Sequence, residues 1–500
     1  MPTQSNPGPS HPLLCRAMIA ICVASLLLAP TMGQPRTAAA AEDPSVVAEQ
    51  ARTALLADRF DEAISLYRQL TKLLPAEPGV RLNLAMALHS AQRYRESVAE
   101  LERLRVSQAR NARYWFLLGV DYLKLEQPRK AVEPLERAVS LDSSYVPARV
   151  ELAGALLESG ALEKAETAFH ALSNDEPSLA KAWQGLAVAR LELSREASNA
   201  LDRLAPDSSF RYALAALAEA AQGNTEQAQM LYRRAGSAAP AAPWIEPELA
   251  GLSSGIETGP KESAAAGHPL ALAFFRGQPE RVLELSSSAR DPEALYWRSR
   301  AYAELARRAV ERLSSLPPSA EQHELLAVAL QRAGRRAEAV AEWREASRLS
   351  PGDHRTRGQL ARSLRLNRQY DEAAALFEEL ARLDPARAEW QFELGDCLTS
   401  QGHPERALGH LSRAVDLRPA ALEYRALLGQ VLLQLGDPKS AVVQLEKASP
   451  LDGDGTLHFQ LANAYRSLGK LGLARQALAR QKELQATAGQ RSTEVTPAAK

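Results

Sequence analysis

A small residue returns at a fixed spacing of 34 along this chain, and this period constrains the possible folds more than any other feature. In the first half of the chain these residues are Ala63, Ser97, Ala131 and Ala165, with successive differences in position of 34 throughout. In the second half they are Ala339, Ala373, Ala407 and Ala441, again at a spacing of 34, followed by Ala474 after 33. Self-similarity at a fixed period of this length indicates stacked supersecondary units.

Other residues keep phase with this position. Four residues later a large residue stands at Tyr67, Leu101, Leu135, Phe169, Tyr232, Trp343, Phe377, Leu411, Leu445 and Leu478. Twelve residues earlier a second small residue stands at Ala51, Ala85, Gly119, Ala153, Ala216, Ala327, Ala361, Gly395, Gly429 and Ala462. Twelve residues later a proline stands at Pro75, Pro177, Pro240, Pro351, Pro385 and Pro419.

This pattern predicts two short antiparallel helices per unit. The small residues mark the place where the two helices cross closely, and the large residue fills the gap between neighbouring units. The proline ends the second helix, because it has no N–H to donate and clashes with the preceding turn.

The unit resembles the tetratricopeptide repeat (TPR), whose pattern is W-x2-L-G-x2-Y, then A-x3-F, then P. One unit meets it with Trp115, Leu118, Gly119, Tyr122, Ala131 and Leu135, although Ser143 replaces the closing proline. The unit from Ala388 carries Leu394, Gly395, Ala407, Leu411 and Pro419. The resemblance covers nearly all of residues 44–486. It implies an all-α solenoid of tandem helix-turn-helix units, wound as a right-handed superhelix with a concave inner face.

The composition agrees with an all-helical chain. Sixty basic residues balance 60 acidic ones, 46% of residues are hydrophobic and only 5% are aromatic. Ala, Leu, Glu and Arg are good helix formers, whereas few β-branched or aromatic residues remain to fill sheets. The zero net charge argues against a general nucleic-acid binder, and the apolar content argues against intrinsic disorder.

The phase of the repeat breaks in the middle of the chain. We therefore predict an N-terminal repeat block over 44–240 and a C-terminal repeat block over 269–486. A Pro-, Gly- and Ser-rich connector over 241–268 joins them. Residues 270–289 and 292–316 are expected to form degenerate helix pairs, and 487–500 a disordered tail.

Residues 1–41 are predicted to be a signal peptide. Residues 17–29 form an uncharged apolar run after Arg16, and the chain then reaches Ala38–Ala41. A basic start, a short apolar core and an A-x-A exit are typical of a secretory signal. We therefore predict a bacterial exported TPR protein that is periplasmic or secreted. The alternative is an uncleaved anchor in the inner membrane. Cys397 is the one cysteine that remains after the signal, which excludes a disulfide framework.

The resemblance implies that ligands lie along the concave face formed by the first helix of each pair. In the N-terminal block the inward positions are largely apolar: Leu82, Met86, Arg113, Phe116, Val120, Leu123, Val150 and Leu157. In the C-terminal block they are more polar: Arg355, Arg362, Arg365, Phe392, Asp396, Gln430, Phe459, Asn463 and Arg466. An apolar groove suits an amphipathic helix or a hydrophobic segment, and the three arginines suit acidic groups. The alternative is that these side chains pack against neighbouring helices or are solvated.

Family members that bind chaperone C-termini carry a carboxylate clamp, which this chain lacks. Asn83 matches its middle Asn, but Ala48 and Arg52 replace the first Lys and Asn, and Leu117 replaces the last Arg. Recognition of a chaperone C-terminus is therefore not expected.

Few motifs for chemistry occur. Gly251–Gly255 fits the G-x-S-x-G form of a hydrolase nucleophile around Ser253, but it lies in the predicted connector. Asp452–Gly455 lacks the spacing of a calcium loop and is interpreted as an inter-repeat turn. No metal-ligand spacing is found among the nine histidines. His323 and His458 share the repeat position of Trp115, which favours a packing role. We expect no enzyme activity, cofactor or metal.

The sequence favours a non-catalytic interaction scaffold that binds peptide segments or partner proteins. Two alternatives stay open. One is an assembly or secretion factor for pili, outer-membrane proteins or surface polysaccharide. The other is a hydrolase that uses Ser253. Nucleic acid is not an expected partner, and the membrane is a partner only through an uncleaved anchor.

Overall fold

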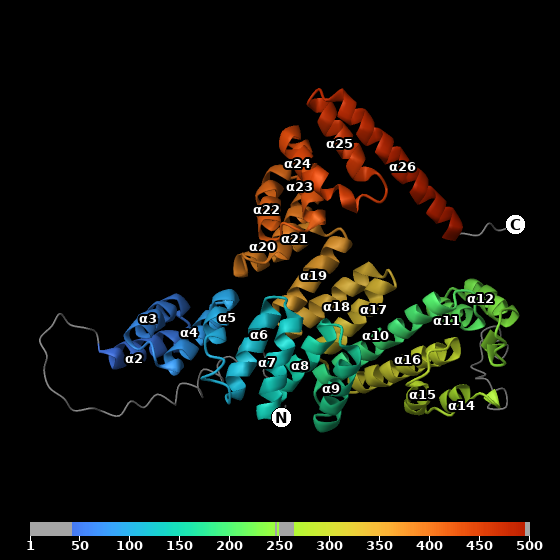
Figure 1. Ribbon diagram of the computed structural model, residues 1–500, viewed down its shortest axis with the longest axis horizontal. Coiled ribbons are helices and arrows are strands. Elements are labelled where there is room, and N and C mark those ends of the chain that lie inside the picture. Colours follow the sequence, from blue (N-terminus) through green and yellow to red (C-terminus); the bar gives the residue numbers. More distant parts are fainter. Residues whose placement is uncertain (1–42, 246–247, 250–264, 496–500) are drawn as a thin grey trace, which may run out of the picture. The chain divides into compact units, whose positions relative to one another are not determined.

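A computed structural model describes residues 43–245, 248–249 and 265–495, with side chains up to residue 487. Over these residues the chain forms 24 α-helices and no strand, and consecutive helices pack in tandem (Figure 1). The predicted all-α solenoid of helical hairpins is confirmed. The chain divides into two compact units between Gln322 and His323, and each unit is described by itself.

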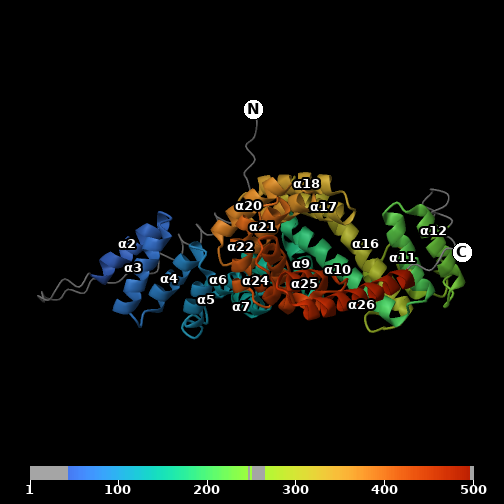
Figure 2. The same ribbon diagram turned by 90° about the horizontal axis from the view of Figure 1, so that it is seen from above.

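Unit 1 begins with four helical hairpins. They are α2 (Pro44–Leu56) with α3 (Phe60–Leu73), α4 (Pro78–Ser90) with α5 (Tyr94–Glu102), α6 (Ala112–Lys124) with α7 (Pro128–Leu141), and α8 (Val146–Glu158) with α9 (Leu162–Asp175). Each helix packs on the helices before and after it in the chain, as Figure 2 also shows. Contacts are therefore local along the sequence, as expected for a solenoid.

Unit 2 contains five hairpins, the first of which uses the part of α17 (Ala320–Arg332) that follows residue 322. The helices are α18 (Arg336–Leu349), α19 (His354–Leu366), α20 (Tyr370–Leu383), α21 (Ala388–Ser400), α22 (Pro404–Leu417), α23 (Leu422–Gln434), α24 (Pro438–Ala448), the 3₁₀ turn η3 (Ser449–Leu451), α25 (Thr456–Ser467) and α26 (Leu471–Val495).

The repeat period is also present in the backbone. The turn between the two helices of each hairpin places one residue at positive φ. In unit 1 these residues are Asp58, Gln92, Glu126 and Gly160, and in unit 2 they are Gly334, Arg368, Gly402, Gly436 and Gly469. Four turns use a residue with a side chain here, although the left-handed region favours glycine. The same turn geometry is thus kept where the sequence differs.

The predicted closing prolines follow the ends of the second helices. Pro75, Pro177, Pro351, Pro385 and Pro419 each stand two residues after the last residue of their helix, and Pro240 stands three residues after the end of α12. A proline at this place ends the helix because it cannot donate the next hydrogen bond.

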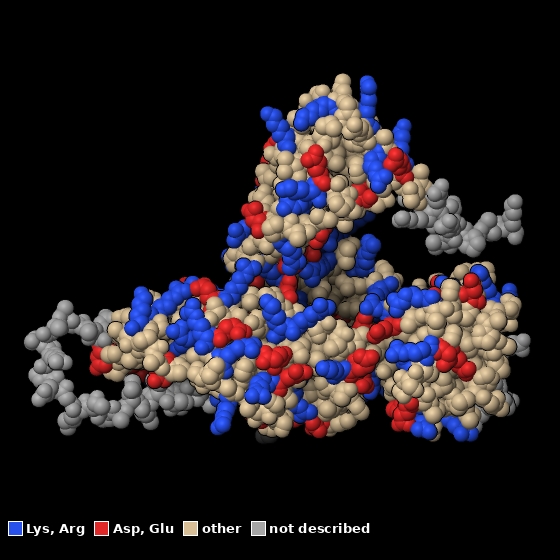
Figure 3. Space-filling view, viewed as in Figure 1, with Lys and Arg blue, Asp and Glu red and all other residues tan. Residues whose placement is uncertain are grey.

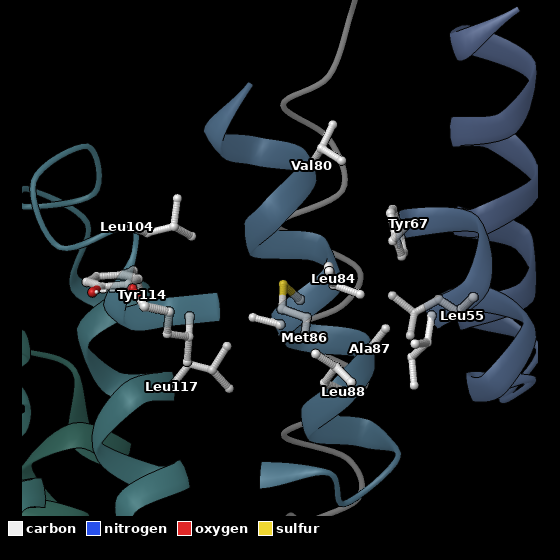
Figure 4. Packing of buried hydrophobic residues seen from close by; sticks show 14 of the residues in the cluster. Leu55, Tyr67, Val80, Leu84, Met86, Ala87, Leu88, Leu104, Tyr114 and Leu117 are labelled. Atoms are coloured by element: carbon white, nitrogen blue, oxygen red, sulfur yellow. Dashed lines mark hydrogen bonds between the residues drawn. The ribbon is translucent and has the colours of Figure 1, made fainter. Parts of the chain in front are cut away.

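Small residues lie where helices cross, as predicted. A Cβ added to Gly119 would lie 2.5 Å from Leu135 Cγ, and one added to Gly395 would lie 2.6 Å from Leu411 Cγ. The large residue therefore covers the small residue of its own hairpin, sixteen positions earlier in the chain. Figure 4 shows the core between α2, α3, α4 and α6, where Leu55, Tyr67, Leu84 and Leu117 are buried.

The middle of the chain differs from the prediction. Between α10 (Ala180–Leu204) and α16 (Pro292–Ser314) lie α11 (Ser209–Ala221), α12 (Thr225–Ser237), α14 (Pro269–Phe275) and α15 (Pro279–Ser286). Residues 292–314 form one continuous helix and not a helix pair. The two compact units also do not divide at the predicted connector, because helices on both sides of it belong to unit 1.

The two long helices α10 and α16 pack together along their lengths and form what we call the split hairpin. Ser194 Oγ donates to Ser299 O at 2.8 Å, and Arg190 Nη1 donates to Leu305 O at 3.2 Å. Ala187 follows Ala153 at the repeat spacing, and Leu305 precedes Ala339 at the same spacing. Each long helix thus keeps the phase of the regular repeats on its own side, and residues 205–291 are inserted between them.

An aromatic cluster forms the core of this inserted region. Trp244, Tyr296 and Trp297 are fully buried, and the ring centroids of the two tryptophans lie 5.0 Å apart. Phe210 and Phe274 add further ring contacts. Trp244 belongs to the predicted connector, yet it is anchored in the core of unit 1. Residues 246–247 and 250–264 of the connector lie outside the described residues.

The predicted termini can be compared only in part. Residues 1–42, which include the predicted signal peptide, lie outside the described residues. The predicted disordered tail began at residue 487, but the backbone of α26 continues as helix to Val495.

Candidate functional site

The first helices of successive hairpins form the inner side of each stack. In unit 1, α4 contacts α6, α6 contacts α8, and α8 contacts α10. In unit 2, α21 contacts α23 and α23 contacts α25. On the inner side of a curved stack, each helix is expected to contact the next helix but one along the chain. The candidate groove residues all lie on these first helices.

The inner side of unit 1 exposes apolar side chains in series. Leu82 on α4, Phe116 and Val120 on α6, and Val150 on α8 are each partly exposed. Phe116 packs edge-on against Tyr145 at the start of α8, with ring centroids 5.1 Å apart. Leu123 and Leu157, on α6 and α8, are also partly exposed. We call Leu82, Phe116, Val120, Leu123, Val150 and Leu157 the apolar groove.

Met86 does not belong to this groove. It is 5% exposed and packs in the core cluster between α4 and α6 (Figure 4). Periodicity placed it on the inward face, but the close approach of α6 covers it. Leu117 stands where the carboxylate clamp of chaperone-binding family members has its last Arg. It is likewise buried, with 3% of its surface exposed. Arg52, at another clamp position, pairs with Glu49 of its own helix.

Polar groups at the inner side of unit 1 are engaged within the protein. His89 Nδ1 on α4 lies 2.5 Å from Asp121 Oδ1 on α6. Arg113, at the start of α6, is partly exposed and has interaction partners of its own. The His89–Asp121 contact therefore joins two neighbouring first helices, and the apolar residues are the groups that a ligand could cover.

The inner side of unit 2 corrects the expectation of an acidic ligand. Arg362 Nε donates to Glu393 Oε1 at 3.0 Å, and Arg365 Nη1 donates to Asp396 Oδ2 at 2.7 Å. Arg365 Nε also forms an ion pair with Glu393 Oε2 at 2.9 Å. Two of the three predicted arginines are thus neutralised by carboxylates of the next first helix, α21. Sequence reasoning missed the buried Glu393.

Burial also changes the chemistry of α21. Burial raises the pKa of Asp396, while Arg365 acts in the opposite direction and Glu393 raises the pKa further. Burial raises the pKa of the neighbouring Cys397 to about 12. A thiol with so high a pKa is a poor nucleophile, because the thiolate is the reactive form. Cys397 therefore packs as a core residue.

The remaining groove candidates of unit 2 are distributed along the stack. Arg355 is exposed in the first turn of α19. Phe392 stacks on Tyr424 of α23, with ring centroids 4.4 Å apart. Asn463 Oδ1 accepts from Arg466 Nη2 at 3.0 Å on α25, where Phe459 is 45% exposed. The structure places these residues on one side but does not gather them into a single site.

Ion pairs also link the second helices of neighbouring hairpins. Arg68 pairs with Glu96 at 2.5 Å in unit 1, and Arg344 pairs with Glu372 at 2.6 Å in unit 2. The two pairs occupy equivalent repeat positions. Figure 3 shows basic and acidic side chains interspersed over the visible face. The basic and acidic side chains, which sum to zero net charge over the chain, therefore lie close to one another.

The other motifs of the sequence have structural roles or cannot be placed. Asp452 accepts from the backbone N–H groups of Gly455 and His458, and Asp454 accepts from that of Thr456. The Asp452–Gly455 segment is thus the turn that begins α25, as predicted. His323 bonds Glu342 within its hairpin. Ser253 lies outside the described residues.

Within the described ranges, no group of three or more His, Cys, Asp or Glu residues could hold a metal ion. In the same part of the chain, no helix is both long enough and apolar enough to cross a membrane.

Comparison with protein families agrees with the hairpin geometry. The tetratricopeptide repeat model matches residues 54–119 and 122–191. These matches run from the end of α2 into the first half of α10 and include the regular hairpins α4–α5, α6–α7 and α8–α9. The chain therefore contains tetratricopeptide repeats. A second model, that of anaphase-promoting complex, cyclosome, subunit 3, matches residues 366–448 in unit 2 of this TPR chain.

Several solved structures are similar to part of the chain. MamA from Desulfovibrio magneticus RS-1 is 21% identical with a TM-score of 0.32, covering 34% of this chain and 96% of its own. YrrB, described as a TPR protein with an unusual peptide-binding site, is 22% identical with a TM-score of 0.31, covering 36% of this chain and 92% of its own. A thermophilic TPR protein of Thermus thermophilus is 22% identical with a TM-score of 0.28, covering 33% of this chain and 91% of its own. No curated protein matches the chain.

Proposed function

We propose that this TPR protein is a non-catalytic interaction scaffold that binds an apolar peptide segment of a partner protein in the apolar groove of unit 1. The observation that carries the proposal is the series of partly exposed apolar side chains on α4, α6 and α8. An amphipathic helix or extended segment that covers such a series gains free energy from burial of its own apolar face.

Unit 2 is a weaker candidate for ligand binding. Its arginines Arg362 and Arg365 already bond carboxylates of α21. Glu393 and Asp396 therefore already offset the charge of these guanidinium groups, and both carboxylates would repel a ligand carboxylate. We infer that unit 1 supplies the main contacts.

We expect Phe116→Ala combined with Val120→Asp to weaken binding of native partners by at least about tenfold. Loss of a buried aromatic anchor commonly costs about 2 kcal/mol or more, and the new carboxylate would be desolvated by an apolar ligand. Quantitative pull-down from the native extract, with bound proteins identified by mass spectrometry, measures this loss.

The matched control is Glu136→Ala with Arg137→Asp, which makes similar changes at two exposed positions of α7 in the same hairpin. It should retain the same partners. If the groove variant retains every partner at wild-type level while the chain is folded, ligands do not use the apolar groove.

We also propose that the scaffold acts in the cell envelope after export. Residues 17–29 form an uncharged apolar run that follows Arg16 and precedes Ala38–Ala41. This arrangement is typical of a cleaved secretory signal. Sequencing the N-terminus of the protein from the envelope fraction should find a start near residue 42. A start at Met1 would favour the anchored alternative.

A further inference from the structure

We propose that, before the N-terminal segment is removed, residues 17–29 of the same chain occupy the apolar groove of unit 1. This inference rests on the proposed function, because it takes the apolar groove to be a ligand site. It identifies a second ligand for that site, an uncharged apolar segment that is covalently attached to the chain.

The groove has the chemistry that such a segment requires. Its six residues come from three consecutive first helices, and all six are partly exposed apolar side chains. Phe116, Leu123 and Leu157 already pack partly against core residues, so their exposed portions form a firm surface. The nearby His89 is paired with Asp121 on the next first helix. An uncharged segment can therefore cover this surface without desolvating a charge of its own.

The segment has matching chemistry and length. Residues 17–29 read AMIAICVASLLLA, with no charged residue and one hydroxyl group. As a helix, these thirteen residues would span about 20 Å. Neighbouring packed helices lie about 8–10 Å apart, so about 20 Å is comparable with the distance across α4, α6 and α8. On such a helix Ile19, Val23, Leu26 and Leu27 share one face, and burial of this face against the groove would remove two apolar surfaces from water together.

The tether between segment and groove is long enough. Residues 30–43 separate the segment from α2, the first helix of the stack. Fourteen residues can reach about 45–50 Å when extended, which exceeds the width of the three first helices. A tethered ligand also has an effective concentration of about millimolar, so weak intrinsic affinity suffices for occupancy.

Occupancy by its own segment would make the groove unavailable to a partner. Removal of residues 1–41 would leave the groove free. While the segment occupies the groove, the apparent affinity for a partner is lowered in proportion to the fraction of chains whose groove is free, and removal of the segment restores the full affinity. The unprocessed chain is thus held in a form that does not bind partners through unit 1.

Disulfide trapping in the full chain tests this proposal. Cys22, which lies within the apolar run, supplies the thiol of the segment. Cys15 is changed to Ser so that it cannot compete, and the buried Cys397 is kept. Val120→Cys places a second thiol in the groove, and Arg137→Cys places one on the exposed side of α7 in the same hairpin. Under mild oxidation at low protein concentration, we expect the intramolecular bond from Cys22 to the thiol at position 120 to form at least about tenfold faster than the bond to position 137.

Val150→Cys on α8 provides a second groove position if the variant at 120 folds poorly. Equal rates at groove and control positions would overturn the proposal. Disulfides that form only between chains would also overturn it, in favour of a second copy in the groove. The pull-down with Phe116→Ala and Val120→Asp uses the processed chain. A failure of the proposed function is therefore distinguished from a failure of self-occupancy.

Discussion

Trp244→Ala is expected to lower the free energy of unfolding of unit 1 by about 3–5 kcal/mol, the usual cost of removing a buried tryptophan. Trp244 is fully buried and contacts Phe210, Tyr296 and Trp297. Its removal leaves a cavity that the surrounding rings cannot fill by small movements, because aromatic side chains are rigid. Hydrogen exchange of peptides from α11, α14 and α16 measures the loss directly within unit 1.

Trp183→Ala is the matched control. Trp183 is partly exposed on α10, and its Nε1 donates to Pro177 O at 2.9 Å. Less apolar area and one hydrogen bond are lost there, so the decrease in protection should be less than half as large. Equal decreases for the two variants would show that residues around Trp244 are a linker, as their composition suggests, and not part of the core.

Gly455→Ala is expected to destabilise the last hairpin of unit 2 by more than about 2 kcal/mol, because strain and a steric clash add together. Gly455 has φ +87°, a region in which a residue with a side chain costs about 1–2 kcal/mol. A Cβ at this position would also lie 2.8 Å from the backbone O of Gln481 on α26. Since backbone atoms cannot rotate away as a side chain can, α25 and α26 would have to separate. Hydrogen exchange in α25 and the first turns of α26 measures the effect.

Gly453→Ala is its control in the same turn. An added Cβ at Gly453 meets no atom within 4 Å, and no positive φ is found there. This substitution should change the stability by about 0.5 kcal/mol or less, as for other open surface sites. If the two variants lose the same protection, close approach of Gly455 to α26 does not limit the packing of this hairpin.

The exposure of a single inward position was harder to predict than the helix face on which it lies. Periodicity places Met86 and Val120 on the same face, yet Met86 is buried and Val120 is partly exposed. The difference depends on how closely α6 approaches α4, and helix periodicity does not report that distance. The Ala, Gly and Leu residues at the crossings set it, together with side chains of neighbouring hairpins.

The arginines of unit 2 show a similar limit. Arg362 and Arg365 lie on the inward face, as predicted, but their shared partner Glu393 lies almost one repeat later in the chain, on the next first helix. A signal for this pairing was present, since opposite charges occupy nearby inward positions of consecutive repeats. The signal becomes convincing only when the distance between the two helices is known.

The sequence by itself determined the hairpins, their period and their turns. Spacings from Ala63 to Ala165 and from Ala339 to Ala474 repeat a local interaction within about 34 residues, and such interactions depend little on the rest of the chain. Only the tertiary structure decided which helices pair where the 34-residue period breaks. The α10 and α16 helices form one split hairpin, although Ser194 and Ser299 are 105 residues apart. The sequence of each helix shows only which of its faces is apolar. Its partner is selected by packing of the whole inserted region between them, and local sequence patterns do not contain that information.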